Sequence, residues 1–144
     1  MEIIRQDTDY AFRMLVNLAA RQDNEPVSTR ILAKQEDVSY QFACKIMQNL
    51  DTHGIVKSKM GPKGGYYLQK PPSKITLKHV LAAIQGPLTV NKCLLGKGKC
   101  PRQKKCPISK NLINLQHQLE NSLDGLTLQN LIETKYDIDK MNKI

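Results

Sequence analysis

The segment 28–54 has the sequence STRILAKQEDVSYQFACKIMQNLDTHG, and it decides the fold. Ser28 and Ser39 favour the position just before a helix, where a side-chain oxygen accepts a backbone N–H. Residues 36–38 fit a tight turn between the two expected helices, and Gly54 stands where a glycine commonly ends a helix. Two helices joined by so short a turn are typical of a helix-turn-helix.

The second helix of this segment is expected to run to His53 and to have two different faces. One face is apolar and is formed by Ala43, Ile46, Met47 and Leu50, with Phe42 at its margin. The other is polar, uncharged or basic, and carries Tyr40, Gln41, Cys44, Lys45 and Gln48. A helix that reads base edges in the major groove needs such a face, and Gln41 suits adenine while Lys45 suits guanine. Many ordinary helical hairpins share this pattern, however.

A β-hairpin is expected directly after the helix-turn-helix. Residues 55–59 and 66–69 have the composition of strands, and Gly61-Pro62-Lys63-Gly64-Gly65 between them is typical of a turn. In this position a hairpin is a wing, whose lysines can contact phosphates. The alternative is a solvated, lysine-rich hairpin. The full set of candidate DNA-binding residues is Ser28, Ser39, Tyr40, Gln41, Cys44, Lys45, Gln48, Lys57, Lys59, Lys63 and Gly64.

Helices are also expected on both sides of this unit. Apolar periodicity predicts a first helix from about Thr8 to Arg21, with Asp7 or Thr8 as its cap. Thr76 is the expected cap of a helix that ends at Gly86. A last helical segment is expected at 126–133, after a break at 124–125, and the tail 137–144 is expected to be loose.

A heptad-like stripe is formed by Ile108, Leu112, Leu115 and Leu119. Its alternating spacing predicts one long helix that packs on a second copy of itself, or alternatively on its own domain. The expected fold is therefore mainly α with a small β-hairpin wing. It comprises a winged helix-turn-helix domain at 1–88, a cysteine-rich segment at 89–107, a dimerisation helix with a C-terminal helical segment at 108–136, and the tail.

The composition favours a nucleic-acid partner. The 144 residues carry a formal net charge of +9, from 22 Lys and Arg against 13 Asp and Glu, which is typical of proteins that bind a polyanion. The sequence has neither a membrane-spanning apolar run nor a signal-peptide pattern at its start, so we expect the protein in the cytoplasm. It shows no arrangement of nucleophile and base, so we expect no enzyme.

Three cysteines follow the pattern C-x6-C-x5-C at Cys93, Cys100 and Cys106. The Gly and Pro residues between them predict a loop in which the thiols can converge. From Lys92 to Lys110 there are seven basic residues and no acidic one, and this charge offsets the negative charge of a thiolate-bound cluster. An iron–sulfur cluster is therefore the favoured interpretation.

Three alternatives remain open for these cysteines. Structural zinc usually has closer cysteine pairs and four ligands, whereas the fourth cysteine, Cys44, is expected on the DNA-reading helix. A regulatory disulfide between any two of the three is a second alternative, and chance clustering is a third. The histidines His53, His79 and His117 are expected to be structural, with His117 the one to test as a ligand.

The sequence resembles the bacterial winged-helix regulators of the IscR, NsrR and RirA group over about residues 1–133. Besides the cysteines, the likeness rests on Thr8-Asp9-Tyr10-Ala11, Gly61-Pro62-Lys63-Gly64-Gly65-Tyr66, Ile84-x-Gly86-Pro87-Leu88 and Leu126-Thr127-Leu128-x-x-Leu131-Ile132. The resemblance implies a homodimer with the helix 108–123 as its interface and a cluster between the subunits. It also implies a regulator, most simply a repressor, that responds to iron or cluster status, redox or nitric oxide.

The resemblance also bears on the fourth cluster ligand. The IscR type has a His three residues after the third cysteine, where this chain has Ser109. The NsrR type takes an Asp from the first helix of the partner subunit, and Asp9 stands at that place. The alternative for Asp9 is an acid that interacts with the positive end of its own helix. A [4Fe–4S] cluster is favoured and a [2Fe–2S] cluster is the second choice.

Two positions depart from the family pattern. The first cysteine gap is one residue longer than in the members compared, and Met60 replaces the Arg that commonly precedes the Gly-Pro of the wing. The expected function is a cluster-dependent transcriptional regulator that binds operator DNA as a homodimer. The alternative function is a cluster-free winged-helix regulator switched by cysteine oxidation or zinc, and an electron carrier that binds no DNA is disfavoured by the wing and the charge.

Overall fold

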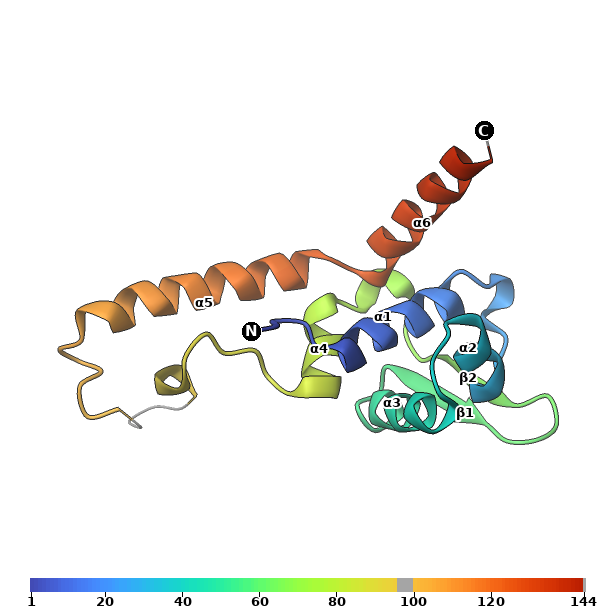
Figure 1. Cartoon of the computed structure of the whole chain (residues 1–144), viewed down its shortest axis with the longest axis horizontal. Coiled ribbons are helices and arrows are strands. Elements are labelled where there is room, and N and C mark those ends of the chain that lie inside the picture. Colours follow the sequence, from blue (N-terminus) through green and yellow to red (C-terminus); the bar gives the residue numbers. More distant parts are fainter. Residues whose placement is uncertain (96–99, 144) are drawn as a thin grey trace.

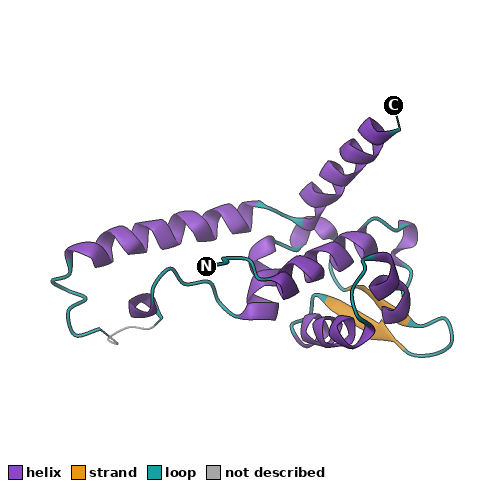
Figure 2. Ribbon diagram, in the orientation of Figure 1, coloured by secondary structure: helices purple, strands orange, loops and turns teal. Residues whose placement is uncertain are grey.

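The computed structural model describes residues 1–95 and 100–143. Its elements are α1 (Gln6–Ala19), η1 (Gln22–Asn24), α2 (Thr29–Gln35), α3 (Tyr40–Thr52), β1 (Val56–Lys59), β2 (Gly65–Leu68), η2 (Pro72–Lys74), α4 (Leu77–Gln85), η3 (Lys92–Leu94), α5 (Pro107–Gly125) and α6 (Leu128–Asn142). Figure 2 shows mostly helix and a two-stranded hairpin, which confirms the predicted fold class. Within the described ranges, no helix is both long and apolar enough to cross a membrane.

The predicted helix-turn-helix is confirmed as α2 and α3. Ser28 and Ser39 cap the two helices. Each hydroxyl oxygen accepts a hydrogen bond of 3.3 Å from the backbone N–H of the residue three positions later in the chain. The turn between them contains Asp37 in the left-handed conformation, with φ of 55°, which Asp tolerates better than most residues. Gly54, just past the end of α3, has φ of 72°, as a helix-ending glycine commonly does.

The wing is attached to the start of α2. Strand β1 pairs antiparallel with β2, so that Lys59 lies opposite Gly65. Tyr66 and Val27 exchange two backbone hydrogen bonds, at 2.8 and 2.9 Å. This close approach needs Gly65, because its φ is 150° and a Cβ there would overlap the Val27 backbone. The wing and the helix-turn-helix are therefore held together as one unit.

The core is aliphatic and surrounds α1. This helix contacts α2, α3, α4 and α6 (Figure 1). The largest fully buried side chains include Met14, Leu15, Leu32, Ile46, Met47, Leu50, Val80, Leu81 and Leu128. Burial of each contributes about 1.5–3 kcal/mol to folding. The predicted apolar face of α3 is fully inside this core, which leaves the other face at the surface.

The start of α1 differs from the prediction. The helix begins at Gln6, after Arg5, so neither Asp7 nor Thr8 is its cap. Asp7 instead forms an ion pair with Arg5 at 2.9 Å. Thr8 is fully buried, and its hydroxyl donates a hydrogen bond of 2.7 Å to Gln85 Oε1. A buried hydroxyl needs such a partner, so Thr8 serves to join α1 to the end of α4.

The long helix α5 extends away from the winged domain and carries the cysteine segment at its far end (Figure 1). It continues through Gly125, so the break comes slightly later than predicted. The chain then returns to the domain: the Leu77 N–H donates to the Leu126 carbonyl oxygen, and the Leu128 N–H donates to that of Ile75, both at 2.9 Å.

The prediction of a short final helix and a loose tail is wrong. Helix α6 continues through Asn142. Thr127 and Asn130 form a capping box at its start, and neither Gly nor Pro interrupts the residues that follow. An ion pair one turn apart, between Lys135 and Asp139 at 3.9 Å, adds a small contribution. Local helix propensity therefore extends the helix beyond its buried part.

Candidate nucleic-acid interface and cysteine segment

The face of α3 that was predicted to read DNA is at the surface. Tyr40, Gln41, Lys45 and Gln48 are exposed, and Cys44 is half-buried between them. No carboxylate of α3 lies on the first three turns of this face, since Asp51 is in the last turn. The face therefore offers hydrogen-bond donors and positive charge, which is what the edges of bases and the phosphates of DNA require.

The wing presents its lysines to solvent. Lys57, Lys59 and Lys63 are all exposed. Gly64 has a structural function, because its N–H donates to the Gly61 carbonyl oxygen at 2.9 Å and a Cβ at this position would overlap the Lys59 carbonyl oxygen. The turn thus closes tightly enough to hold the three ammonium groups on one short hairpin.

Two tyrosines lie near Cys44. An interaction with the Cys44 side chain raises the pKa of Tyr40 above its ordinary 10.0, while Arg30 opposes this with a smaller effect. Burial raises the pKa of Tyr66, and Asp51 and Cys44 add to the increase. Both phenols are therefore neutral at physiological pH and can donate hydrogen bonds to acceptors on DNA.

The three cysteines of the cysteine-rich segment lie at different structural positions. Cys93 is in the short helix η3, Cys100 is in the loop, and Cys106 immediately precedes α5. All three are free and half-buried. Part of the predicted loop, residues 96–99, lies outside the described residues. The segment therefore extends from a helical turn to the start of the long helix.

The structure of one chain does not gather these thiols into a metal site. In the described part of the chain, no three His, Cys, Asp or Glu side chains lie close enough together to hold one metal ion. The donor chemistry nevertheless fits an iron–sulfur cluster, since free thiols are its usual ligands and the basic segment suits a negatively charged group. The N-terminal end of α5, which follows Cys106, also favours negative charge.

The remaining ligand candidates lie apart from the thiols in a single chain. The Asp9 side chain is 59% exposed on α1 and forms an ion pair with Arg13 at 3.4 Å. Ser109, at the position where the IscR type has its His, is buried on α5. His117 is exposed and lines a pocket of about 390 Å³ beside Leu94. Of these three side chains, Asp9 is the one that offers a carboxylate oxygen at the protein surface.

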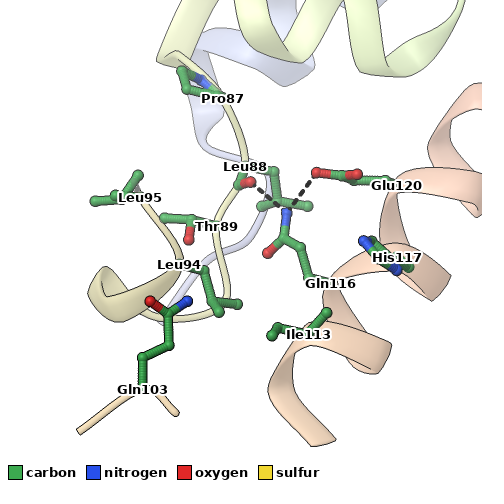
Figure 3. A pocket seen from close by; sticks show the side chains of 10 residues that line it. All are labelled: Pro87, Leu88, Thr89, Leu94, Leu95, Gln103, Ile113, Gln116, His117 and Glu120. Carbon is green, nitrogen blue, oxygen red and sulfur yellow. Dashed lines mark hydrogen bonds between the residues drawn. The ribbon is translucent and has the colours of Figure 1, made fainter. Parts of the chain in front are cut away.

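A buried glutamine anchors the chain that leads into the cysteine segment (Figure 3). Gln116, on α5, is only 9% exposed, and its Nε2 donates to the Leu88 carbonyl oxygen at 2.7 Å. Its Oε1 accepts from the Val90 N–H at 2.8 Å, and Nε2 also donates to Glu120. Sequence reasoning missed this residue. The sequence signal that could have found it is a polar side chain directly after Leu115, on the face of the helix next to the leucine stripe.

The leucine stripe of α5 is only partly covered, since Leu112 and Leu119 are half-buried. Ser109 and Gln116 are the residues of α5 that bury against the same chain, and they lie one position after members of the stripe. Ile108 is 61% exposed and Leu115 is 45% exposed. Leu112, Leu115 and Leu119 line an open groove of about 550 Å³ with Ile3, Leu88 and Val90. The stripe is thus partly covered by its own chain, while Ile108 and Leu115 are left exposed.

Comparison with known proteins identifies the family. The chain matches the Rrf2 family, described as "Iron-dependent Transcriptional regulator", over residues 4–134. It is 27% identical over 130 residues to the HTH-type transcriptional regulator IscR of Klebsiella pneumoniae, covering 90% of this chain and 79% of that protein. These relatives are transcriptional regulators rather than enzymes.

Solved structures show the same fold. The global cysteine regulator CymR of B. subtilis matches with a TM-score of 0.74 and 23% identity, over 93% of this chain and 98% of that one. IscR of T. potens matches with a TM-score of 0.71 and 21% identity, over 92% of this chain and 87% of that one. The helix-turn-helix, the wing and the family match over most of the sequence agree: the chain belongs to the Rrf2 family of transcriptional regulators.

Proposed function

We propose that this protein is a cytoplasmic, homodimeric repressor that binds operator DNA and whose affinity depends on an iron–sulfur cluster. The observation that carries the proposal is the combination of two features in one chain. A helix-turn-helix with an exposed polar and basic face and a lysine-bearing wing comes first, and three free thiols follow on the basic segment that leads into α5. The signal belongs to the chemistry of the cluster: iron supply, redox state or nitric oxide.

DNA binding uses α3 and the wing. The N-terminal half of α3 enters the major groove, where Gln41 contacts adenine and Lys45 contacts guanine. Tyr40, Cys44 and Gln48 complete this surface. The wing lysines and the hydroxyls of the two helix caps contact phosphates and set the orientation of the protein. The exposure of the four α3 side chains other than Cys44, and of the three wing lysines, supports this assignment.

The dimer forms through α5. The groove beside Leu112, Leu115 and Leu119 is apolar and open, and a second copy of the stripe has the matching spacing to fill it. Dimerisation buries Ile108 and Leu115, which a single chain leaves to solvent. Two winged domains then present two recognition helices, whose separation must match successive turns of the major groove.

Cys93, Cys100 and Cys106 are the residues that would hold a cluster, with Asp9 of the partner subunit as a fourth ligand. A [4Fe–4S] cluster is favoured, with [2Fe–2S] as the second choice. When bound, such a group supplies an oxidisable iron centre that reacts with small molecules. A carboxylate is a hard ligand beside soft thiolates, so the position it occupies is the more easily exchanged. The exposure of Asp9 supports its assignment.

The chain itself provides a short connection from the cysteine segment to the DNA-reading unit. Gln116 holds residues 88–90, and Gln85 accepts hydrogen bonds from Thr8 and from the Arg5 N–H. Only Gly86 and Pro87 separate Gln85 from Leu88. A displacement of the cysteine segment therefore reaches α1, which packs on α3, through very few residues.

A second candidate function is a cluster-free regulator switched by thiol oxidation or zinc. It is favoured by one observation: the thiols are free and are not gathered in a single chain. Anaerobic purification followed by absorbance spectroscopy and assays of iron, sulfide and zinc separates the candidates. Equal iron and sulfide with broad visible absorbance supports the cluster. A colourless protein that stays colourless after anaerobic reconstitution refutes it, and bound zinc or reversible disulfides would then support the second candidate.

A further inference from the structure

Arg30 and Tyr40 form a cation–π pair where the two helices of the helix-turn-helix approach each other. The guanidinium carbon of Arg30 lies 4.5 Å from the centre of the Tyr40 ring. Arg30 is in the first turn of α2, and Tyr40 is the first residue of α3. Both residues are exposed, so the pair is part of the surface formed by the DNA-reading face. Sequence reasoning had included Tyr40 but not Arg30.

The hydrogen-bond donors of Arg30 have no acceptor within the described residues. The other three arginines of residues 1–95 are each paired within the chain: Arg5 with Asp7, Arg13 with Asp9, and Arg21 with Asn17. A guanidinium that lies over the face of an aromatic ring still has N–H groups at its edge that are available to an acceptor. Such a group is suited to two parallel hydrogen bonds with a phosphate.

Cys44 is a second neighbour of Tyr40. Cys44, one turn later on α3, interacts with the Tyr40 side chain, and this interaction raises the pKa of the phenol. The hydroxyl therefore stays protonated at physiological pH. With the guanidinium over its face, the ring has fewer rotamers to lose when DNA binds.

We propose that Arg30 and Tyr40 act as one recognition unit, in which Arg30 binds a backbone phosphate and thereby holds the Tyr40 ring against a base in the major groove. The inference rests on the proposed function, since it requires α3 to enter the groove. N-terminal residues of a recognition helix are the ones that reach base edges, and Tyr40 is the first residue of α3. Base preference at one operator position thus depends on an arginine that contacts the backbone alone.

The test compares variants on an operator selected with the wild-type protein from a random duplex library. Arg30→Ala, Tyr40→Ala and the double variant are measured at several salt concentrations. Arg30→Ala is expected to weaken binding about tenfold and to reduce the salt slope by about one, because one phosphate contact is lost. Tyr40→Ala is expected to weaken binding about tenfold in the wild type and much less in Arg30→Ala, because the pair is coupled.

Two further variants separate the contributions of charge, stacking and the hydroxyl, and a third is a control. Arg30→Lys keeps the charge but not the planar stack, so it should preserve the salt slope and relax the preference at one base pair. Tyr40→Phe keeps the stack and should preserve the coupling. Lys140→Ala removes one charge from the exposed end of α6, away from α3 in Figure 1, and should leave binding unchanged. Circular dichroism confirms that each variant is folded.

The outcomes are distinguishable. Additive effects of Arg30→Ala and Tyr40→Ala, or an unchanged salt slope in Arg30→Ala, would overturn the recognition unit while leaving the proposed function intact. A wild-type protein that selects no duplex sequence, with or without its cluster, would overturn both. Coupled effects, a lower slope and a relaxed preference at one position in Arg30→Lys would support the unit.

Discussion

The side-chain amide of Gln116 donates a hydrogen bond of 2.7 Å to the carbonyl oxygen of Leu88, and so joins the long helix α5 to the chain that enters the cysteine segment. The same amide accepts the Val90 N–H at 2.8 Å. Both backbone groups lie in a half-buried position, where a hydrogen-bond partner is favoured. Because Cys106 immediately precedes α5, this one side chain ties the two ends of the cysteine segment together.

The Gln116 contacts give a first prediction. Gln116→Ala leaves two backbone groups unsatisfied, so the free energy of unfolding should fall by about 1–3 kcal/mol. The difference in operator affinity between cluster-loaded and cluster-free protein should also shrink, because residues 88–90, which lead into the cysteine segment, are no longer held to α5. Urea unfolding and DNA titration measure the two effects. Gln118→Ala, an exposed glutamine on the same helix, is the matched control, and an equal loss in both variants would contradict this account.

Dimerisation gives a second prediction. Leu115→Glu places a charge in the stripe at a residue that is exposed in one chain, so the fold should survive while the dimer dissociates. Analytical ultracentrifugation should show a monomer with an unchanged circular dichroism spectrum. Gln118→Glu adds the same charge outside the stripe and should remain dimeric. A dimeric Leu115→Glu variant would place the interface elsewhere.

The Asp9 carboxylate gives a third prediction. Asp9→Ala removes an exposed ion pair with Arg13, which costs at most about 1 kcal/mol of stability, so the fold should be retained. Loss of the fourth ligand should make the iron more labile to chelators and change the visible spectrum. Arg13→Ala breaks the same ion pair while keeping the carboxylate. If it released iron as fast as Asp9→Ala, Asp9 would not be a ligand.

The tyrosines give a prediction about pH. The pKa of Tyr66 is raised in the folded state, chiefly by burial, so the unfolded chain loses this proton first as the pH rises above 10.0. The contribution to stability is therefore fully present below that pH and is lost as the pH rises through the folded-state pKa. Urea unfolding should show that the free energy of unfolding falls between about pH 9 and about pH 11, and that it falls less in Tyr66→Phe than in the wild type. An equal decline in both proteins would exclude Tyr66 as a source.

Sequence reasoning predicted those features that depend on neighbours in the chain. Ser28, Ser39 and Gly54 mark the helix ends by local hydrogen bonding and backbone conformation, and the buried face of α3 follows from periodicity. Thr8 was wrongly predicted as a helix cap and Gln116 was missed, because their partners are 77 and 28 residues away. The pairing of Arg30 with Tyr40 likewise depends on how α2 and α3 pack.

The cysteine segment shows a different limit. Its spacing and charge indicate a cluster, yet one chain does not bring Cys93, Cys100 and Cys106 together. Thiolate ligands repel one another until a metal offsets their charge. Under the proposed function, a loaded dimer with a ligand from the partner subunit would complete the site, so a single chain would not be expected to contain its arrangement.

We propose above all that the state of a cluster on these cysteines sets the affinity for operator DNA. The most direct measurement is the dissociation constant of one anaerobic preparation, at one salt concentration, before and after its cluster is removed. We predict at least a tenfold change, about 1.4 kcal/mol, and no change in a Cys93→Ala variant that lacks the cluster from the outset. Equal affinity of the loaded and cluster-free protein would contradict the claim.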